Sequence, residues 1–377
     1  MKIGIVCYPT YGGSGVMATE LGKALANKGY YVHFISTAQP VRLESLGTHL
    51  YYHEVNVMAY PLFEYVPYES ALISKLVDVI KYEQLDILHV HYAIPHAFAA
   101  YVAKQILLQQ NINIPVVTTL HGTDITLVGK DITYEPAVTF SINQSDAVTA
   151  VSEYLKDETY RFFDIRKEIR VIPNFVDFER FNKKKKDHFK TALAPNGEKI
   201  LVHISNFRPV KRIEDVIDIF AIVREIIPCK LLLVGDGPER AGIEQKVRQL
   251  NLGHDVRFLG KIEAVEEVLS IADIFLLPSE KESFGLAALE AMACEVPVIS
   301  SDAEGIPEVN INGITGFVSK VGDVDDMASN TIKLLSNPEL HKQFSQNALT
   351  KAQEFDLDTV MDMYEKLYHE LVPVGVI

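Results

Sequence analysis

The stretch KIGIVCYPTYGGSGVMATELGKALA, residues 2–26, contains the pattern that decides the fold. Its first part, Lys2–Cys7, is a short apolar run rich in β-branched residues, as expected for a buried strand. A polar loop with the glycines of Gly12–Gly15 follows, and then Met17, Leu21 and Leu25 recur at helical spacing. The stretch therefore predicts one strand–loop–helix unit of a parallel α/β sheet.

The same unit repeats along the 377 residues. Continuous apolar strands that alternate with amphipathic helices indicate parallel sheets covered on both faces, so we expect an α/β fold with two Rossmann-like halves. We expect the halves to span residues 1–172 and 173–355, with the C-terminal segment 356–377 returning to the first half as an amphipathic helix. The further predicted strands are Tyr31–Ile35, Ile87–Val90, Val116–Leu120 and Ala147–Ala150, and then Lys199–Ile204, Lys230–Val234, Val256–Leu259, Ile274–Leu277 and Val296–Ser300.

Composition limits the classes of function. The formal net charge of -14 disfavours a nucleic-acid-binding protein, so we expect small-molecule substrates and no nucleic-acid partner. Three scattered cysteines are too few for a disulfide framework, and no apolar run reaches the ~18 residues that span a bilayer. With a first strand that begins at the N-terminus, these features predict a cytoplasmic protein without stable membrane insertion. The sequence is compatible with a homo-oligomer but does not predict one.

Polar loops follow several of the predicted strands. In open parallel sheets, ligands bind beyond the carboxyl ends of the strands, so these loops are candidate site segments. With two halves facing each other, we expect them to line one deep cleft. The loops are Gly12–Gly15, His121–Asp124, Asn206–Arg212, Gly235–Pro238 and Glu282–Leu286.

The Gly12–Gly15 loop has two interpretations. Glycines between a strand and a helix let backbone N–H groups approach a phosphate at the helix N-terminus, but the same residues also suit a tight turn. The loop matches neither a Walker loop nor the GxGxxG spacing of a dinucleotide-binding dehydrogenase.

The segment Ser205–Arg212 places three cations, Arg208, Lys211 and Arg212, within five residues after a predicted strand. Cations stabilise a leaving diphosphate, whereas a helix N-terminus alone disfavours positive charge. An anionic ligand explains the cluster better than a solvated helix start does.

Two glutamates, Glu282 and Glu290, bracket Gly285 and the start of a predicted helix. The helix N-terminus can point at a phosphate, and the two carboxylates can accept hydrogen bonds from sugar or ribose hydroxyls. On spacing alone, two surface glutamates are an equally good interpretation.

Several motifs resemble those of one enzyme family. Glu282 and Glu290 match the EX7E signature of retaining glycosyltransferases with the GT-B fold. The stretches PSEKESFGLAALEAMACEVPVI, NFRPVKR, LLLVGDGPE and GIPEV, together with GGSG, are similar to those of glycosyltransferase family 4. The resemblance covers essentially the whole chain. EX7E together with NFRPVKR speaks against a sugar-nucleotide epimerase, and the missing GxGxxG spacing speaks against a dehydrogenase. The presence of both glutamates and both cations argues against a non-catalytic sugar-binding protein.

The resemblance implies the donor and its residues. The stretches CYPTYGGSGVMATELGKALA and HISNFRPVKR are most similar to family members that transfer N-acetylglucosamine from UDP-N-acetylglucosamine to L-malate in bacillithiol biosynthesis. Such enzymes act by front-face substitution, require no metal or other cofactor, and would use His121, Arg208, Lys211 and Glu282 in catalysis. The implied UDP-sugar-binding residues are Gly12, Gly13, Arg208, Lys211, Glu282, Phe284, Gly285, Leu286 and Glu290.

The acceptor is less well defined by the motifs. A small dicarboxylate such as malate needs hydrogen-bond donors, and the alternative is another small or lipid acceptor such as an inositol phosphate. An inositol lipid would call for a basic amphipathic face, and the sequence contains no convincing one. The candidate acceptor-binding residues, from loop position and resemblance, are Ser14, Tyr92, Thr118, Thr119 and Asn206.

Four further features carry secondary hypotheses. His89, His91 and His96 have a spacing that allows a metal site, although histidines that border a substrate loop or are satisfied in the core fit better. Cys7 is expected to be a small buried hydrophobe. The run Lys183–Lys186 suits a solvated connector, and the aromatic group Phe63, Tyr65 and Tyr68 either covers an acceptor pocket or packs on itself.

Overall fold

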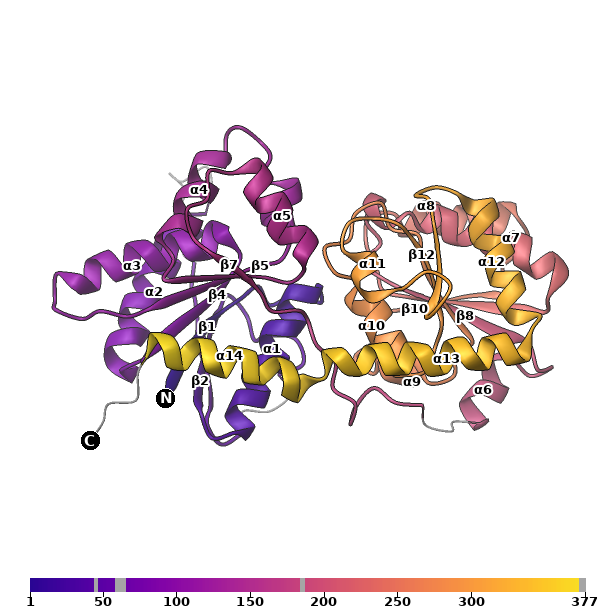
Figure 1. Ribbon diagram of the computed structural model, residues 1–377, viewed down its shortest axis with the longest axis horizontal. Coiled ribbons are helices and arrows are strands. Elements are labelled where there is room, and N and C mark those ends of the chain that lie inside the picture. Colours follow the sequence, from indigo (N-terminus) through magenta and orange to yellow (C-terminus); the bar gives the residue numbers. More distant parts are fainter. Residues whose placement is uncertain (44–46, 58–65, 184–186, 373–377) are drawn as a thin grey trace. The chain divides into compact units, whose positions relative to one another are not determined.

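Two parallel β-sheets organise the chain in the computed structural model, which describes residues 1–43, 47–57, 66–183 and 187–372 (Figure 1). The first sheet has the order β3-β2-β1-β4-β5-β6-β7 and the second the order β10-β9-β8-β11-β12-β13. Each sheet belongs to one compact unit, and the pair confirms the two predicted Rossmann-like halves. The strands are β1 Lys2–Val6, β2 Tyr31–Ser36, β3 Leu50–Glu54, β4 Ile87–His91, β5 Val116–Leu120, β6 Ala147–Ala150 and β7 Ile169–Val171 in the first sheet, and β8 Lys199–Ile204, β9 Cys229–Val234, β10 Val256–Gly260, β11 Ile274–Leu277, β12 Val298–Ser301 and β13 Gly316–Ser319 in the second.

The units divide at Asn174 and Leu357. One comprises Met1–Asn174 together with the segment that begins at Asp358, and the other comprises Phe175–Leu357. The helices of the first unit are α1 Gly13–Asn27, α2 Tyr68–Glu83, α3 Phe98–Leu108, α4 Glu135–Gln144, α5 Glu153–Phe162 and α14 Leu357–Leu371. Those of the second are α6 Asp187–Leu193, α7 Ile213–Ile226, α8 Arg240–Gln249, α9 Val265–Leu269, α10 Leu286–Ala293, α11 Ile306–Val309, α12 Val324–Leu335 and α13 Pro338–Ala352.

Successive side chains along the strands of the first sheet point to opposite faces, and each face packs against different helices. Val6 and Ile35 pack into one apolar cluster with residues of α2 and α3. Phe34, the neighbour of Ile35, points the other way, where a Cβ added to Gly22 of α1 would lie 2.3 Å from its ring. Because both faces are covered by helices, the strands read as continuous apolar runs.

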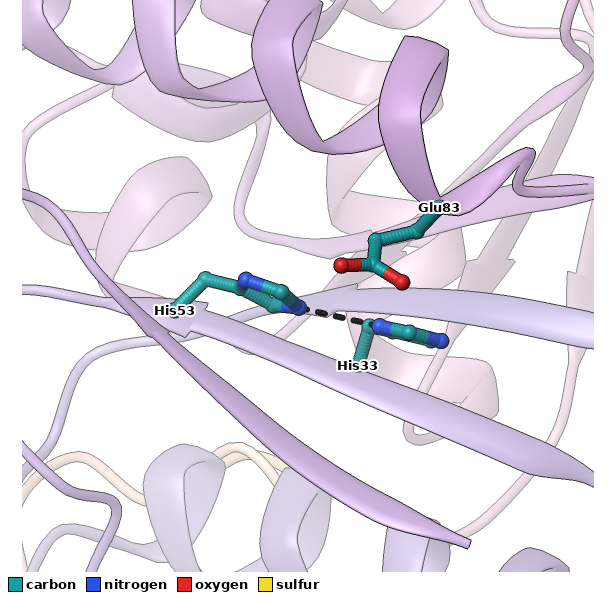
Figure 2. A group of neighbouring side chains, drawn as sticks. All are labelled: His33, His53 and Glu83. Atoms are coloured by element: carbon teal, nitrogen blue, oxygen red, sulfur yellow. Dashed lines mark hydrogen bonds between the residues drawn. The ribbon is translucent and has the colours of Figure 1, made fainter.

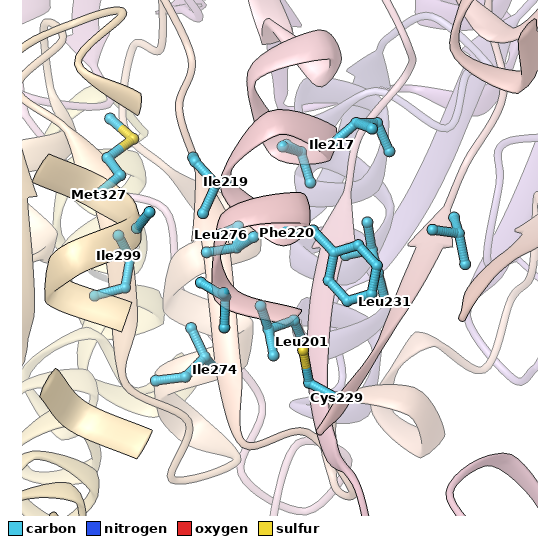
Figure 3. Packing of buried hydrophobic residues seen from close by; sticks show 14 of the residues in the cluster. Leu201, Ile217, Ile219, Phe220, Cys229, Leu231, Ile274, Leu276, Ile299 and Met327 are labelled. Carbon is cyan, nitrogen blue, oxygen red and sulfur yellow. The ribbon is translucent and has the colours of Figure 1, made fainter. Parts of the chain in front are cut away.

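The second unit has an equivalent core (Figure 3). Side chains of its central strands, including Leu201, Leu231, Leu276 and Ile299, pack against Phe220 of α7, and all are fully buried. Removing this much apolar surface from water is the main stabilising contribution to the unit.

Helix α14 returns to the first sheet and packs on the face opposite α2 and α3. Tyr364, Leu367 and Tyr368 are buried, and the Tyr368 hydroxyl lies 2.7 Å from Nδ1 of His89 on β4. At the helix surface, Lys28 at the end of α1 pairs with both Asp362 and Glu365. The amphipathic pattern of this segment thus has a partner surface.

We expect Tyr368→Phe to destabilise the first unit. Burial lowers the pKa of His89 to about 3, so its ring is neutral and needs one donor and one acceptor partner. Removing the hydroxyl leaves Nδ1 buried without a partner, which costs about 1–3 kcal/mol. The lower urea midpoint is measured against Tyr82→Phe, because the Tyr82 side chain is 76% exposed. Equal midpoints for the two variants would show that the bond contributes nothing.

The cysteines and the lengths of the helices also agree with the sequence. All three cysteines are free and buried, and burial raises the pKa of each thiol to about 12, as expected for Cys7 as a small hydrophobe. Among the described helices, none is long and apolar enough to cross a membrane. Phe63, Tyr65 and Lys184–Lys186, which belong to two of the secondary hypotheses, lie outside the described residues.

Candidate active site

The glycine loop of the first unit joins β1 to α1. Gly12 is the N-cap residue of α1, so the helix begins at Gly13 and the free N–H groups of its first turn lie in the predicted loop. A Cβ on Gly15 would lie 2.5 Å from the carbonyl oxygen of Thr10, whereas a Cβ on Gly12 would make only an ordinary contact of 3.5 Å. The tight turn therefore requires Gly15, whereas packing does not require a glycine at position 12.

Ser14 and Tyr92, two predicted acceptor residues, lie together. Their hydroxyl oxygens are 2.6 Å apart, with Ser14 in the first turn of α1 and Tyr92 directly after β4. The backbone of Tyr92 has a φ of 85°, an uncommon conformation for a non-glycine residue that often marks functional segments.

Thr118 and Thr119 are not acceptor ligands, contrary to the prediction. Both are fully buried on β5. The Thr118 hydroxyl lies 2.7 Å from that of Ser145, and the Thr119 hydroxyl bonds both His89 and Thr149. The prediction assumed that Thr118 and Thr119 belong to the loop after the strand. Strand β5 continues to Leu120, so both side chains point into the core, and the loop begins only at His121.

His121 follows β5 and contacts a group of buried histidines. Its Nε2 lies 2.7 Å from Nδ1 of His91, whose ring in turn stacks on His89 with centroids 4.5 Å apart. Burial lowers the pKa of His121 to about 3, so the ring is neutral near pH 7. In this state His121 can orient a sugar hydroxyl but supplies no positive charge.

The metal interpretation of His89, His91 and His96 is not supported. His89 uses both ring nitrogens on Tyr368 and Thr119. His96 must donate Nδ1–H to the carbonyl oxygen of His91 at 2.6 Å, and its Nε2 lies 3.0 Å from the Tyr68 hydroxyl. These nitrogens are occupied by hydrogen bonds, whereas Nε2 of His91 is buried without a partner among the described residues. A single unpaired nitrogen does not make a metal site, so histidines held in the core are the better description.

Asp124 holds the loop that presents His121. Its buried carboxylate accepts hydrogen bonds from the backbone N–H groups of Ala93 at 2.9 Å and Gly122 at 3.1 Å. Burial raises the pKa of Asp124 to about 6, against the lowering effect of these donors. The sequence predicted His121–Asp124 as a candidate site loop, but it did not predict that Asp124 holds this loop in place.

The cations of the second unit have three different environments. Lys211 lies 2.5 Å from the carboxylate of Glu282, and both side chains are about four-fifths buried, being 18% and 19% exposed. Arg212 instead pairs at 2.6 Å with Asp215 in the first turn of α7, as a solvated helix start would require. Arg208 is exposed and makes no ion pair with the described residues, so its guanidinium is available to an anion.

The segment with the two glutamates begins helix α10. Gly285 is its N-cap with a φ of 98°, Leu286 is its first residue, and Glu290 lies in the second turn with 5% of its surface exposed. The Phe284 side chain is buried against Phe355, so only its backbone can face a ligand. The two glutamates therefore have different environments. Glu282 precedes the helix and pairs with Lys211, whereas Glu290 is buried within α10.

Glu304 and Gly305 clamp this segment, and the sequence did not reveal their role. The Glu304 carboxylate accepts the backbone N–H of Glu282 at 2.9 Å, and the Gly305 N–H donates to the Glu282 carbonyl oxygen at 3.0 Å. A Cβ on Gly305 would lie 2.2 Å from the Ser283 carbonyl oxygen. The only signal was the glycine of the GIPEV stretch, since the lack of a Cβ permits such close approach of another backbone.

Asn206 lies in the loop that carries Arg208. Its side-chain oxygen is buried and has no hydrogen-bond partner within the described residues. A Cβ on Gly237 would lie 2.1 Å from the Asn206 carbonyl oxygen, so the GDGP loop supports this one from behind. An unpaired buried acceptor is costly unless a ligand donates to it.

Comparisons with known proteins agree with this fold. Residues 11–180 match the model of Glycosyltransferase Family 4, and residues 184–351 match that of Glycosyl transferases group 1. The chain belongs to the family 4 glycosyltransferases with the GT-B fold, which confirms the resemblance and the predicted enzyme class of UDP-sugar glycosyltransferases.

Three individual proteins show how similar this chain is to known glycosyltransferases. The chain is 47% identical over 374 residues to N-acetyl-alpha-D-glucosaminyl L-malate synthase of Bacillus anthracis, covering 99% of this chain and 97% of that protein. It is 27% identical over 244 residues to D-inositol 3-phosphate glycosyltransferase of Saccharomonospora viridis, covering 61% and 56%. The solved structure of Anabaena Alr3699/HepE in complex with UDP and glucose superposes with a TM-score of 0.83 at 22% identity, covering 98% and 100%.

Proposed function

We propose that this enzyme transfers N-acetylglucosamine from UDP-N-acetylglucosamine to L-malate with retention of configuration, the first step of bacillithiol biosynthesis. The observation that carries the proposal is the 47% identity to the Bacillus anthracis synthase over nearly the full length of both chains. The reduced, buried cysteines support a cytoplasmic location for the reaction.

The donor would bind to the second unit. Arg208 and Lys211 would neutralise the diphosphate, and the N–H groups at Gly285 and Leu286 would meet it at the N-terminus of α10. Glu290 would accept the ribose hydroxyls, and Glu282, held by Lys211, would accept those of the donor sugar. The backbone of Phe284 completes this set.

The first unit would contribute Gly12, Gly13 and His121 to the donor and the Ser14–Tyr92 pair to the acceptor. Neutral His121 suits a sugar hydroxyl, because it can donate or accept a hydrogen bond without a charge to desolvate. Asn206 would bind the acceptor by donating its side-chain N–H to a carboxylate, and its buried, unpaired side-chain oxygen could accept a hydrogen bond from a substrate hydroxyl.

The reaction would proceed on one face of the sugar. The C1–O bond to the β-phosphate breaks, the malate hydroxyl oxygen forms the new bond to C1, and its proton passes to an oxygen of the leaving β-phosphate. The chain supplies orientation and charge stabilisation, with no enzyme nucleophile. We expect no metal requirement. The sequence contains the Asp-x-Asp pattern of a metal-binding motif at Asp323–Asp325 and Asp356–Asp358. Asp323, however, caps α12 by accepting the N–H of Asp326.

A panel of acceptors tests the proposal. Purified enzyme with UDP-N-acetylglucosamine is offered L-malate, other small acids and inositol phosphates, and release of UDP and of the product is measured with and without a chelator. The proposal predicts turnover with L-malate. Turnover with an inositol phosphate alone would favour the alternative acceptor, which the weaker likeness to the inositol 3-phosphate enzyme makes the second candidate.

The acceptor role of the hydroxyl pair gives a separate expected result. Ser14→Ala and Tyr92→Phe should each raise the KM for malate roughly tenfold, because hydrogen bonds to a charged group contribute about 1.5–3 kcal/mol. The KM for the donor should change little. Ser70→Ala, on the exposed side of α2, is the matched control. An unchanged malate KM in both variants would remove the pair from the acceptor site.

A further inference from the structure

A second cluster of ionisable side chains lies apart from the candidate active site. His33 is in the middle of β2, His53 is on the neighbouring strand β3, and Glu83 is the last residue of α2 (Figure 2). The candidate loops follow the ends of strands, whereas β2 continues for three residues after His33. No part of the proposed reaction uses this cluster.

The three groups are close enough together to share one metal ion. One ligand atom from each residue lies within 4.8 Å of the others, and Nδ1 of His33 is 2.9 Å from Nε2 of His53. Two nitrogens bound tetrahedrally to zinc at 2.0–2.1 Å are about 3.3 Å apart, so a small separation of the rings admits the ion. In Figure 2 the Glu83 carboxylate points toward this pair from above the sheet.

The backbone holds the ligands before any ion binds. His33 and His53 lie on the same face of adjacent paired strands, since His33 pairs with Tyr51 and Ile35 with His53. Glu83 is fixed at the end of α2, where its carbonyl oxygen accepts a hydrogen bond from the Lys2 ammonium at 2.7 Å. Only side-chain rotations are then needed to close a site.

The hydrogen bond between the two rings is compatible with an ion. A histidine binds a metal through a ring nitrogen that carries no proton. The ring that donates the present hydrogen bond need only move its proton to its other nitrogen.

We propose that His33, His53 and Glu83 bind a zinc ion that ties the edge strand β3 to β2 and α2. Two imidazole nitrogens and one carboxylate are a donor set that zinc accepts, with water in the fourth position. The carboxylate offsets part of the ionic charge. Lys2 and Lys75 are nearby cations that oppose an ion, and Asp78 adds a nearby negative charge. The role is structural, because the cluster lies away from the strand ends that carry the loops.

Zinc titration of the full chain tests the site. After dialysis against a chelator, calorimetry with Zn²⁺ should show one tight ion per chain, and zinc at about a hundred times its dissociation constant should raise the unfolding midpoint by about 5 °C. His33→Asn, His53→Asn and Glu83→Gln should each weaken this binding at least tenfold. Glu83→Gln keeps the helix end intact if a histidine variant folds poorly.

The matched controls are His254→Asn and Glu225→Gln, exposed residues of the second unit that should leave the binding unchanged. Absence of tight zinc binding would overturn the proposal. So would binding that persists at full strength in Glu83→Gln and His53→Asn, since the ion would then lie elsewhere.

Discussion

Lys211→Ala should lower kcat several-hundred-fold while the KM for the donor changes much less. Negative charge grows on the diphosphate as the C1–O bond breaks, so a cation aimed at it stabilises the transition state more than the bound substrate. Loss of one such donor costs about 3–4 kcal/mol of barrier. Lys211 is suited to this role because four-fifths of its side chain is buried and its charge is poorly screened by water.

The ion pair with Glu282 offers a second explanation that kinetics can separate. If Lys211 acts only by placing Glu282, then Lys211→Ala combined with Glu282→Gln should be no worse than Glu282→Gln alone. If Lys211 contacts the diphosphate, the double variant should be slower than either single variant. Lys342→Ala, on the exposed surface of α13, is the control, and wild-type turnover in Lys211→Ala would end its assignment as a catalytic residue.

Gly305→Ala should lower kcat about a hundredfold, although Gly305 need not touch a substrate. Its added Cβ would meet the Ser283 carbonyl carbon at 2.7 Å, and this backbone cannot yield without moving Glu282 and Phe284. A displacement of about 1 Å at a positioned group costs about 10²-fold in rate. Steady-state kinetics on the folded variant, with circular dichroism as a check, measures the loss.

Two variants make that result specific. Gly242→Ala in α8 adds the same methyl group where nothing lies within 4 Å, and it should leave activity unchanged. Glu304→Gln keeps an oxygen that can accept the Glu282 N–H and should lose less activity than Glu304→Ala. Full activity in Gly305→Ala would mean that the clamp does not position the segment.

The buried parts of the fold were predictable because their strands are apolar on both faces. The strands β3, β7 and β13 were missed, since they lie at sheet edges and their short or half-polar sequences lack that pattern. At the site, charge and glycine marked Arg208, Lys211 and Gly285 correctly as loop or helix-start residues. The acceptor set failed at Thr118 and Thr119 because sequence position alone does not show where a strand side chain stops facing the core.

Hydrogen bonds and ion pairs between residues far apart in the chain could not be predicted from the sequence. Nothing in the spacing indicated that Glu304 would bond the backbone of Glu282, or that Arg212 would pair with Asp215 while Lys211 pairs with Glu282. Such pairs depend on how loops from different strands meet, which is decided by packing at close range.

The return of α14 to the first sheet has a consequence for synthesis of the chain. Domains generally fold as units while the ribosome elongates them. The second unit is complete once residue 357 has been made, but the first lacks Tyr364 and Tyr368 until residues 364–368 follow, which leaves the part of the sheet around His89 without its covering helix. The half that begins first is therefore expected to be the half that matures last.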